Sequence, residues 1–341
     1  TDPEVTQSSL QILYKQEARK TRQLSDYKNA LAKDFFIQLC NMRLAEQTRK
    51  SATPYLAASL SNSALVGNIE TNGIQITPKP DSLQSSINAV YYTLAQIAKH
   101  GFTNDELDRL KSDYRSMLIQ SLKEYDKTDS KSFMDQILAY YLKGDPAPSF
   151  QFLQPILLNA LEEIRMNDIL TYGKEFEGHQ NRDMVLVYND DVKVVPNEST
   201  LNDWIINASK QEVSAYQEER LAEQLLPTLP QPGQIVSEQD DQKVGTQTLL
   251  LSNGAKVILK PTTLKNDEIL LTSYSPGGYS QYALKDFQSA TNAVAIVTNS
   301  GLGPFNSLQL SRYLNGKHAT ASPFINEIGE GIKAQANRED L

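Results

Sequence analysis

The stretch Leu251-Ser252-Asn253-Gly254-Ala255-Lys256-Val257-Ile258-Leu259-Lys260-Pro261 decides how the end of the chain is interpreted. Apolar runs flank its Asn-Gly pair, a dipeptide that favours the tight turn of a β-hairpin. The sequence therefore predicts a strand, a turn and a second strand. A third strand is predicted from Glu268 to Tyr274, then Pro276-Gly277-Gly278, then a helix from Leu284 to Asn299. Strands followed by a helix indicate a domain in which helices cover a sheet.

The same domain continues to the last residue of the sequence. Its limits are predicted at residues 246 and 341. After the helix, the predicted elements are the glycine turn Ser300-Gly301-Leu302-Gly303-Pro304, a short helix from Asn306 to Leu314, and strands from His318 to Ile325 and from Gly331 to Ala336.

The sequence pattern of residues 1–195 predicts another α+β domain, which precedes the one just described. Apolar residues at spacings of three and four indicate amphipathic helices, and alternating ones indicate strands. Asn72-Gly73 predicts a hairpin turn. The predicted strands are Val5–Lys15, Tyr55–Leu60, Ala64–Ile69, Gly73–Thr77 and Met184–Tyr188, and the predicted helices are Ser25–Lys50, Asp81–Gly101, Thr103–Leu122, Ser130–Leu142 and Leu161–Phe176. A mixed or antiparallel sheet with helices packed on one side is the simplest architecture for this order.

Residues 196–245 predict an interdomain connector. A helical stretch around Trp204 gives way to Pro227-Thr228-Leu229-Pro230-Gln231-Pro232-Gly233 and then to the polar run Ser237–Lys243. Prolines cannot continue a helix and favour a stiff, extended path.

Composition limits the classes of function. The 341 residues carry a formal charge of -8, which argues against a nucleic-acid-binding surface because such a surface needs clustered Lys and Arg. Cys40 is the only cysteine, and its apolar helical surroundings favour a buried, unreactive thiol. No apolar run is long enough to predict a membrane span. The ends, Thr1-Asp2-Pro3 and Arg338-Glu339-Asp340-Leu341, suggest a piece excised from a longer protein.

Five short stretches are similar to a known protein family. They are Asn41-Met42-Arg43-Leu44, His100-Gly101-Phe102-Thr103-Asn104-Asp105-Glu106-Leu107, Leu251–Pro261, Lys265-Asn266-Asp267-Glu268-Ile269-Leu270 and Ser275-Pro276-Gly277-Gly278. With them the chain resembles the pitrilysin/insulinase zinc metallopeptidases, in particular long bacterial members built of two halves. The resemblance implies that residues 1–195 are the second, non-catalytic domain of the full-length protein. It implies that residues 246–341 are the N-terminal part of a further, inactive copy.

The zinc motif of that family, His-x-x-Glu-His, is absent from these 341 residues. The corresponding helix contains Thr291-Asn292-Ala293-Val294-Ala295, and none of these residues binds zinc. The three histidines, His100, His179 and His318, are far apart in sequence, and the pair Glu175 and His179 spans an expected helix end at Gly178. We therefore predict no metal site and no cofactor in this chain, with zinc expected in the missing catalytic domain.

Other catalytic patterns are also absent. Ser300-Gly301-Leu302-Gly303 lacks the Gly-x-Ser-x-Gly elbow of a nucleophilic serine. The glycine pairs match no phosphate-binding or dinucleotide-binding loop. The prediction is that the chain contains no catalytic and no cofactor-binding residue.

The resemblance implies a function for the longer protein, a clamshell in which two halves enclose a chamber and unstructured peptides are cut. This chain would form chamber wall and hinge, with closure about the segment from Pro227 to Gly233. Its expected partners are the missing catalytic and C-terminal domains and a peptide substrate, without nucleic acid and without a membrane span. The alternative is a degenerate homologue that acts only as a protein- or peptide-binding module. Similar long bacterial members suggest the periplasm or cell envelope.

Overall fold

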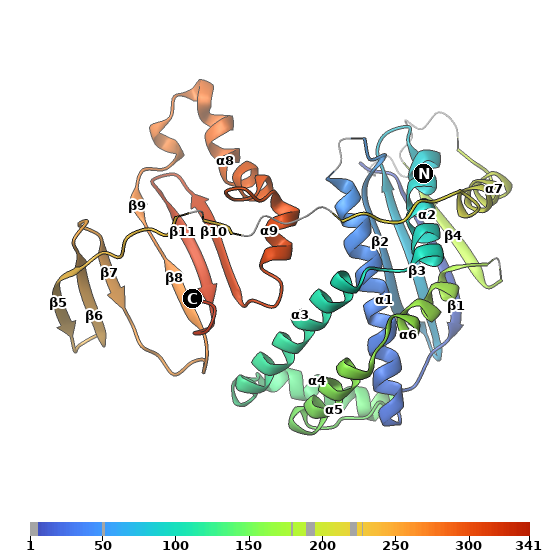
Figure 1. The fold of residues 1–341 in the computed structure, drawn as a ribbon, viewed down its shortest axis with the longest axis horizontal. Helices are drawn as coiled ribbons and strands as arrows, with labels where there is room; N and C mark the ends of the chain where they lie inside the picture. Colours follow the sequence, from blue (N-terminus) through green and yellow to red (C-terminus); the bar gives the residue numbers. More distant parts are fainter. Residues whose placement is uncertain (1–5, 50–51, 179, 189–194, 219–223, 227) are drawn as a thin grey trace. The chain divides into compact units, whose positions relative to one another are not determined.

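The computed structural model describes residues 6–49, 52–178, 180–188, 195–218, 224–226 and 228–341 (Figure 1). Its chain divides into two compact units. Unit 1 comprises Thr1–Arg115 and Phe133–Glu219, and unit 2 comprises Ser116–Ser132 and Arg220–Leu341. The helix α3 (Asn104–Lys123) therefore contributes residues to both units.

Unit 1 contains a four-stranded antiparallel sheet in the order β2-β3-β1-β4. Its strands are β1 (Ser9–Glu17), β2 (Tyr55–Val66), β3 (Ile69–Pro78) and β4 (Arg182–Val187). Leu10, Ile12 and Tyr14 of β1 are buried, as expected when alternate residues of a strand face one core. Because β4 pairs with β1, a strand from the second segment of unit 1 lies beside the first strand of the chain.

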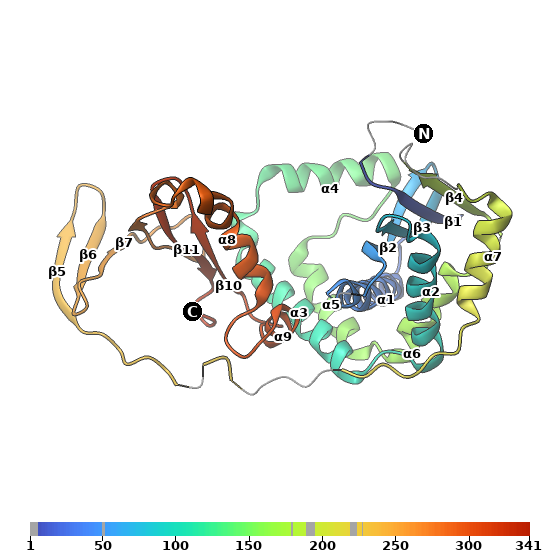
Figure 2. The same cartoon turned by 90° about the horizontal axis from the view of Figure 1, so that it is seen from above.

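Helices cover one face of this sheet, which confirms the predicted α+β class (Figure 2). Helix α1 (Leu24–Thr48) buries Phe35 and Leu39, and helix α2 (Leu83–His100) buries Ile87 and Val90. These side chains share one apolar core with the strands. The helical elements that follow α3 in the chain are η1 (Tyr125–Lys127) in unit 2, α4 (Ser130–Lys143), whose first residues are assigned to unit 2, and α5 (Phe150–Glu163), α6 (Met166–Leu170), η2 (Thr171–Phe176) and α7 (Glu198–Ser209) in unit 1.

The hairpin turn of unit 1 differs from the prediction. Asn72 and Gly73 lie inside the continuous strand β3, and the turn is formed around Gly67, whose φ is 58°. Gly73 is paired with Ser61 of β2, and a Cβ at Gly73 would lie 2.9 Å from the Ser61 Oγ. A side chain at position 73 would need the Ser61 hydroxyl to rotate away, so Gly73 suits the close approach of two strands and does not form a turn.

The predicted helix Leu161–Phe176 is also wrong in its limits. Helix α5, which the sequence pattern did not predict, ends at Glu163, and α6 begins after Arg165. The Asp168 carboxylate accepts the Arg165 backbone N–H at 2.9 Å, an N-terminal capping contact that starts the new helix. Pro155 lies inside α5, and proline ordinarily argues against a helix interior.

Residues 211–218, here called the strap, follow α7 and pack on unit 1. The Gln96 side chain donates to the Ser214 carbonyl at 2.7 Å, and a ring nitrogen of His100 lies 3.1 Å from the Val213 carbonyl oxygen. Arg109 pairs with Glu218 at 2.6 Å. The first part of the predicted connector 196–245 is therefore structured on unit 1, while the predicted domain limits themselves stay a prediction.

Unit 2 contains two small antiparallel sheets. One has the order β5-β6-β7, and the other has the order β10-β11-β8, with β9 paired to β11. The strands are β5 (Ile235–Asp241), β6 (Thr246–Leu251), β7 (Lys256–Leu259), β8 (Ile269–Thr272), β9 (Ser275–Pro276), β10 (Ala319–Ile325) and β11 (Gly329–Ala336). The polar run predicted as connector is thus an edge strand, β5.

The predicted β-hairpin of unit 2 is present, with Gly254 at a φ of 83° in the turn between β6 and β7. The predicted long helix is η4 (Leu284–Asp286) followed by α8 (Phe287–Ser300), and it is preceded by η3 (Tyr279–Gln281). The short helix is α9 (Ser307–Tyr313), capped by Asn306. Among the described residues, no helix is both long enough and apolar enough to cross a membrane.

The end of α3 and the residue that follows it hold the segment before β8 within unit 2. Lys123 pairs with Asp267 at 2.6 Å, and Glu124 accepts the backbone N–H of Asp267 at 2.7 Å. The Ser116 hydroxyl donates to the Gly316 carbonyl at 2.9 Å. Residues 116–132 are thus an integral part of this unit.

Candidate functional site

The histidines do not form a metal site in the part of the chain that the structure describes. His100 contacts the strap of unit 1, whereas His318 precedes β10 of unit 2. His179 lies outside the described residues. No group of three or more His, Cys, Asp or Glu side chains that could hold a metal ion is found among the described residues. Within the described ranges, the side chains present do not supply the three protein ligands that a catalytic zinc ion needs.

In the helix that corresponds to the zinc-binding helix of the resembled family, the polar side chains bond to the backbone of the same helix. On α8, the Thr291 hydroxyl donates to the Phe287 carbonyl at 3.0 Å, and the Asn292 side chain donates to the Gln288 carbonyl at 2.8 Å. These contacts are local side-chain to backbone bonds within one helix.

The glycine turn after α8 has a structural role. The Ser300 hydroxyl donates to the Ile296 carbonyl at 2.6 Å, so it is held inside the helix. Gly301 has a φ of 102°, and a Cβ at this position would lie 2.1 Å from the Phe305 carbonyl oxygen. A side chain is excluded there by both conformation and space.

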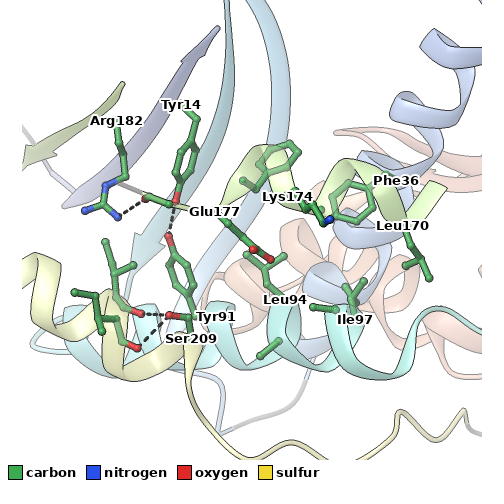
Figure 3. A pocket seen from close by; sticks show the side chains of 17 residues that line it. Tyr14, Phe36, Tyr91, Leu94, Ile97, Leu170, Lys174, Glu177, Arg182 and Ser209 are labelled. Atoms are coloured by element: carbon green, nitrogen blue, oxygen red, sulfur yellow. Dashed lines mark hydrogen bonds between the residues drawn. The ribbon is translucent and has the colours of Figure 1, made fainter. Parts of the chain in front are cut away.

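The candidate functional site is a cavity of about 400 Å³ in unit 1 (Figure 3). Six segments line it: β1, α1, α2, the segment from the end of α6 through η2 to Gly178, the start of β4, and α7. Its walls are mostly apolar and include Phe36, Leu94, Ile97, Leu170 and Ile205. The volume lies within the range of about 300 to 1,000 Å³ that is typical of small-molecule pockets.

Two buried tyrosines form the polar part of the cavity wall. The hydroxyls of Tyr14 and Tyr91 are 3.1 Å apart, and both side chains are 5% exposed. Burial raises the pKa of Tyr14, and it raises the pKa of Tyr91 well above the ordinary value of 10.0. Both hydroxyls are therefore protonated donors at neutral pH.

Three ionisable side chains also line the cavity: Lys174, Glu177 and Arg182. Arg182 is already engaged, because it donates to the Gly178 carbonyl at 3.1 Å and to the side chain of Asn202. Lys174 and Glu177 are exposed and have no ion-pair partner among the described residues. Figure 3 shows both projecting from the η2 segment toward α2.

A separate charged cluster lies beside β3. The Lys33 ammonium is 2.9 Å from Glu70 and 3.1 Å from Glu175, and its side chain is 8% exposed. Burial by itself would raise the pKa of Glu175, but the contacts from Arg19 and Lys33 outweigh it and leave that pKa below its ordinary value of 4.5. Every charge in this cluster has a partner, as buried charges require.

Sequence reasoning missed this cavity. Its residues come from segments as distant as Tyr14 and Ser209, and each of them is unremarkable by itself: a strand tyrosine, apolar helix positions, a turn lysine. No motif or spacing joins them, so only the tertiary structure brings them together.

Both sequence relatives found by comparison with known proteins are named as zinc proteases. No protein-family model matches the chain. A zinc protease PQQL-like protein of Arabidopsis thaliana is 22% identical over 305 residues, which is 88% of this chain and 29% of that protein. The probable zinc protease PqqL of Escherichia coli K12 is 20% identical over 308 residues, again 88% of this chain and 32% of that protein. The chain spans about three tenths of the length of these relatives.

Solved structures share the fold. The periplasmic protease PqqL from Escherichia coli matches with a TM-score of 0.59 and 18% identity, covering 99% of this chain and 38% of that one. The ferredoxin protease FusC, crystallised with Arabidopsis ferredoxin, matches with a TM-score of 0.59 and 16% identity, covering 99% and 38%. Pitrilysin matches with a TM-score of 0.53 and 13% identity, covering 98% and 35%. The named relatives are zinc proteases and the shared fold is that of PqqL and pitrilysin, and both findings support the pitrilysin/insulinase family for this chain.

Proposed function

We propose that this chain is the non-catalytic chamber-wall and hinge portion of a zinc-dependent metalloendopeptidase that cleaves unstructured peptides. One observation carries the proposal: the chain aligns with two zinc proteases over 88% of its length, yet its sequence contains no His-x-x-Glu-His. Zinc and its ligands would then lie elsewhere in a longer protein. The residues of this chain would shape the chamber and bind peptide.

Exposed apolar side chains support a role inside a larger assembly. On α4, Met134 is 61% exposed and Tyr141 is 83% exposed, and on β5 of unit 2, Val236 is 63% exposed. Contiguous exposed apolar surface marks interaction sites in soluble proteins. We propose that other domains of the longer protein cover these surfaces.

The hinge is proposed for the proline-rich segment at residues 227–233, of which residues 228–233 are described. Proline stiffens an extended segment, so exchange for a Gly-Ser sequence of equal length should change how closure gates access to the chamber. We expect a changed turnover number for the longer enzyme with the exchanged segment. Unchanged turnover would count against the hinge.

The alternative is a homologue that binds protein or peptide without cutting. The cavity of unit 1 favours this alternative, because a cavity can bind a ligand without any catalytic residue. The sequence encoded beside this segment discriminates between the two: His-x-x-Glu-His with a downstream Glu supports the peptidase, and its absence supports the binding module. A periplasmic or cell-envelope location is proposed from the PqqL structure, which is described as periplasmic.

The first experiment is to measure the zinc content of the purified chain by elemental mass spectrometry, together with hydrolysis of an internally quenched, unstructured peptide. We expect negligible zinc and no cleavage by this chain alone. A tightly held ion near one per chain, with cleavage that chelation abolishes, would overturn the non-catalytic assignment.

A further inference from the structure

The cavity of unit 1 contains a buried tyrosine pair with one hydroxyl proton that makes no hydrogen bond within the described residues. The hydroxyls of Tyr14 and Tyr91 hold two protons, and one of them is used in the hydrogen bond between the two oxygens. No described residue accepts the other. A buried donor without an acceptor is costly, so the arrangement favours an acceptor atom that enters from the cavity.

The charges at the cavity are of opposite sign and lie close in sequence. Lys174 belongs to η2, and Glu177 directly follows that helix. No ion pair within 4.0 Å joins them, and among the described residues neither is paired elsewhere. They leave one cationic and one anionic group facing the cavity from the same turn (Figure 3).

The rest of the lining is apolar. Leu94, Ile97 and Ile205 form one side, and Phe36 and Leu170 form another. Such a wall binds a bulky hydrocarbon or aromatic group by removing it from water.

We propose that this cavity binds a free amino acid with a bulky apolar side chain. Its ammonium would pair with Glu177 and its carboxylate with Lys174, while the tyrosine pair would donate to a carboxylate oxygen. The side chain would lie against the α2 and α7 residues. The inference goes beyond the proposed function, because it depends on unit 1 alone and holds whether or not the longer protein is a peptidase.

The test is a calorimetric titration of the 341-residue chain with L-phenylalanine. Two analogues separate the charges: 2-phenylethylamine lacks the carboxylate, and 3-phenylpropanoate lacks the ammonium. We expect saturable binding of L-phenylalanine and an affinity about tenfold lower for each analogue, since each loses one charged contact. Equal affinity for L-phenylalanine and both analogues would overturn the zwitterionic ligand class.

Variants locate the ligand. Ala95 lines the cavity from α2, so Ala95→Leu fills it and should abolish binding, whereas Ala45→Leu on the exposed face of α1 should not. If Ala95→Leu fails to fold, Ala98→Leu at a more exposed lining position replaces it. Glu177→Gln should weaken the binding of L-phenylalanine and of 2-phenylethylamine but not of 3-phenylpropanoate. Lys174→Gln should weaken the binding of L-phenylalanine and of 3-phenylpropanoate but not of 2-phenylethylamine. No saturable binding to the folded chain, or binding that ignores the cavity-filling variants, would refute the site.

Discussion

Arg43 and Glu106 form a buried ion pair through two parallel hydrogen bonds. The Arg43 Nε donates to Oε1 at 2.8 Å and its Nη2 donates to Oε2 at 2.7 Å, and the two side chains are 2% and 5% exposed. This contact joins the first long helix to the start of α3. Both residues belong to short stretches that carried the family resemblance, Asn41–Leu44 and His100–Leu107, and the structure shows that the two stretches contact each other.

The same two residues organise their surroundings. The Glu106 carboxylate also accepts the Thr103 backbone N–H at 2.6 Å, which completes the predicted capping box. The Arg43 guanidinium lies over the rings of Phe102 and Tyr216, at 5.0 and 4.3 Å from their centroids. Tyr216 belongs to the strap, so this ion pair connects α1, α3 and the strap.

Loss of one partner of this pair should destabilise unit 1 strongly. Arg43→Met leaves the Glu106 carboxylate buried without its cation, and the expected loss is about 3 to 5 kcal/mol. Adding Glu106→Gln removes the unpaired charge but keeps a capping acceptor, so stability should partly recover. Urea unfolding followed by the fluorescence of Trp204, the only tryptophan and a residue of unit 1, measures both.

An exposed pair is the matched control. Arg115 and Glu162 also form an ion pair, but their side chains are 45% and 62% exposed. Arg115→Met should leave the urea midpoint essentially unchanged. A comparable loss in both variants would mean that burial does not set the importance of the Arg43 pair.

Unit 1 should lose stability in acid. The folded-state pKa of Glu70 and of Glu175 is lower than the ordinary value of 4.5, because the contacts from Lys33 to Glu70, and from Arg19 and Lys33 to Glu175, outweigh burial. A depressed pKa means that stability is fully present above the ordinary pKa and falls as pH drops through the folded pKa. We expect the Trp204 urea midpoint to fall between about pH 5 and about pH 3.

The variant Glu175→Gln checks the source of that acid sensitivity. It removes one depressed carboxyl, so the midpoint should be lower at neutral pH and should change less on acidification. Asp183→Asn at the more exposed Lys15 pair, where the carboxylate is 54% exposed, is the control. An unchanged acid slope in Glu175→Gln would contradict this assignment.

Gly301 should be intolerant of any side chain. Gly301→Ala places a Cβ against the Phe305 carbonyl in addition to the strain of a φ of 102°. Gly254→Ala has a φ of 83° but nothing within 4 Å of the added Cβ. The control should cost about 1 kcal/mol from backbone strain alone, and Gly301→Ala clearly more. Pulse proteolysis with mass spectrometry of unit 2 fragments measures the difference, and equal losses would show that the close carbonyl can move away.

The strap should depend on Tyr216. Its hydroxyl donates to Glu46 and its ring covers Arg43. Tyr216→Ala removes both contacts and should increase amide hydrogen exchange in residues 211–218, whereas Tyr216→Phe keeps the ring and should increase it less. If both variants exchange like the unchanged protein, the strap is held by its other contacts.

Much of the secondary structure could be predicted because its signals are local. The capping box from Thr103 to Glu106, the Gly101 end of α2 and the hairpin at Gly254 each depend on residues within one turn of chain. Asn72-Gly73 failed as a turn prediction because glycine also suits a strand position that a neighbouring strand approaches closely. That neighbour is Ser61 across the sheet, which the local sequence does not reveal.

The sequence by itself determined that these 341 residues contain no His-x-x-Glu-His, and that helices and strands follow one another in a family-like order. It did so because residue type, spacing and capping are properties of short segments. Only the tertiary structure decided that Arg43 meets Glu106 and that Tyr14, Tyr91, Lys174 and Glu177 line one cavity. Those relationships join residues far apart in the chain, and their positions are fixed by packing in a common core, not by any pattern along the sequence.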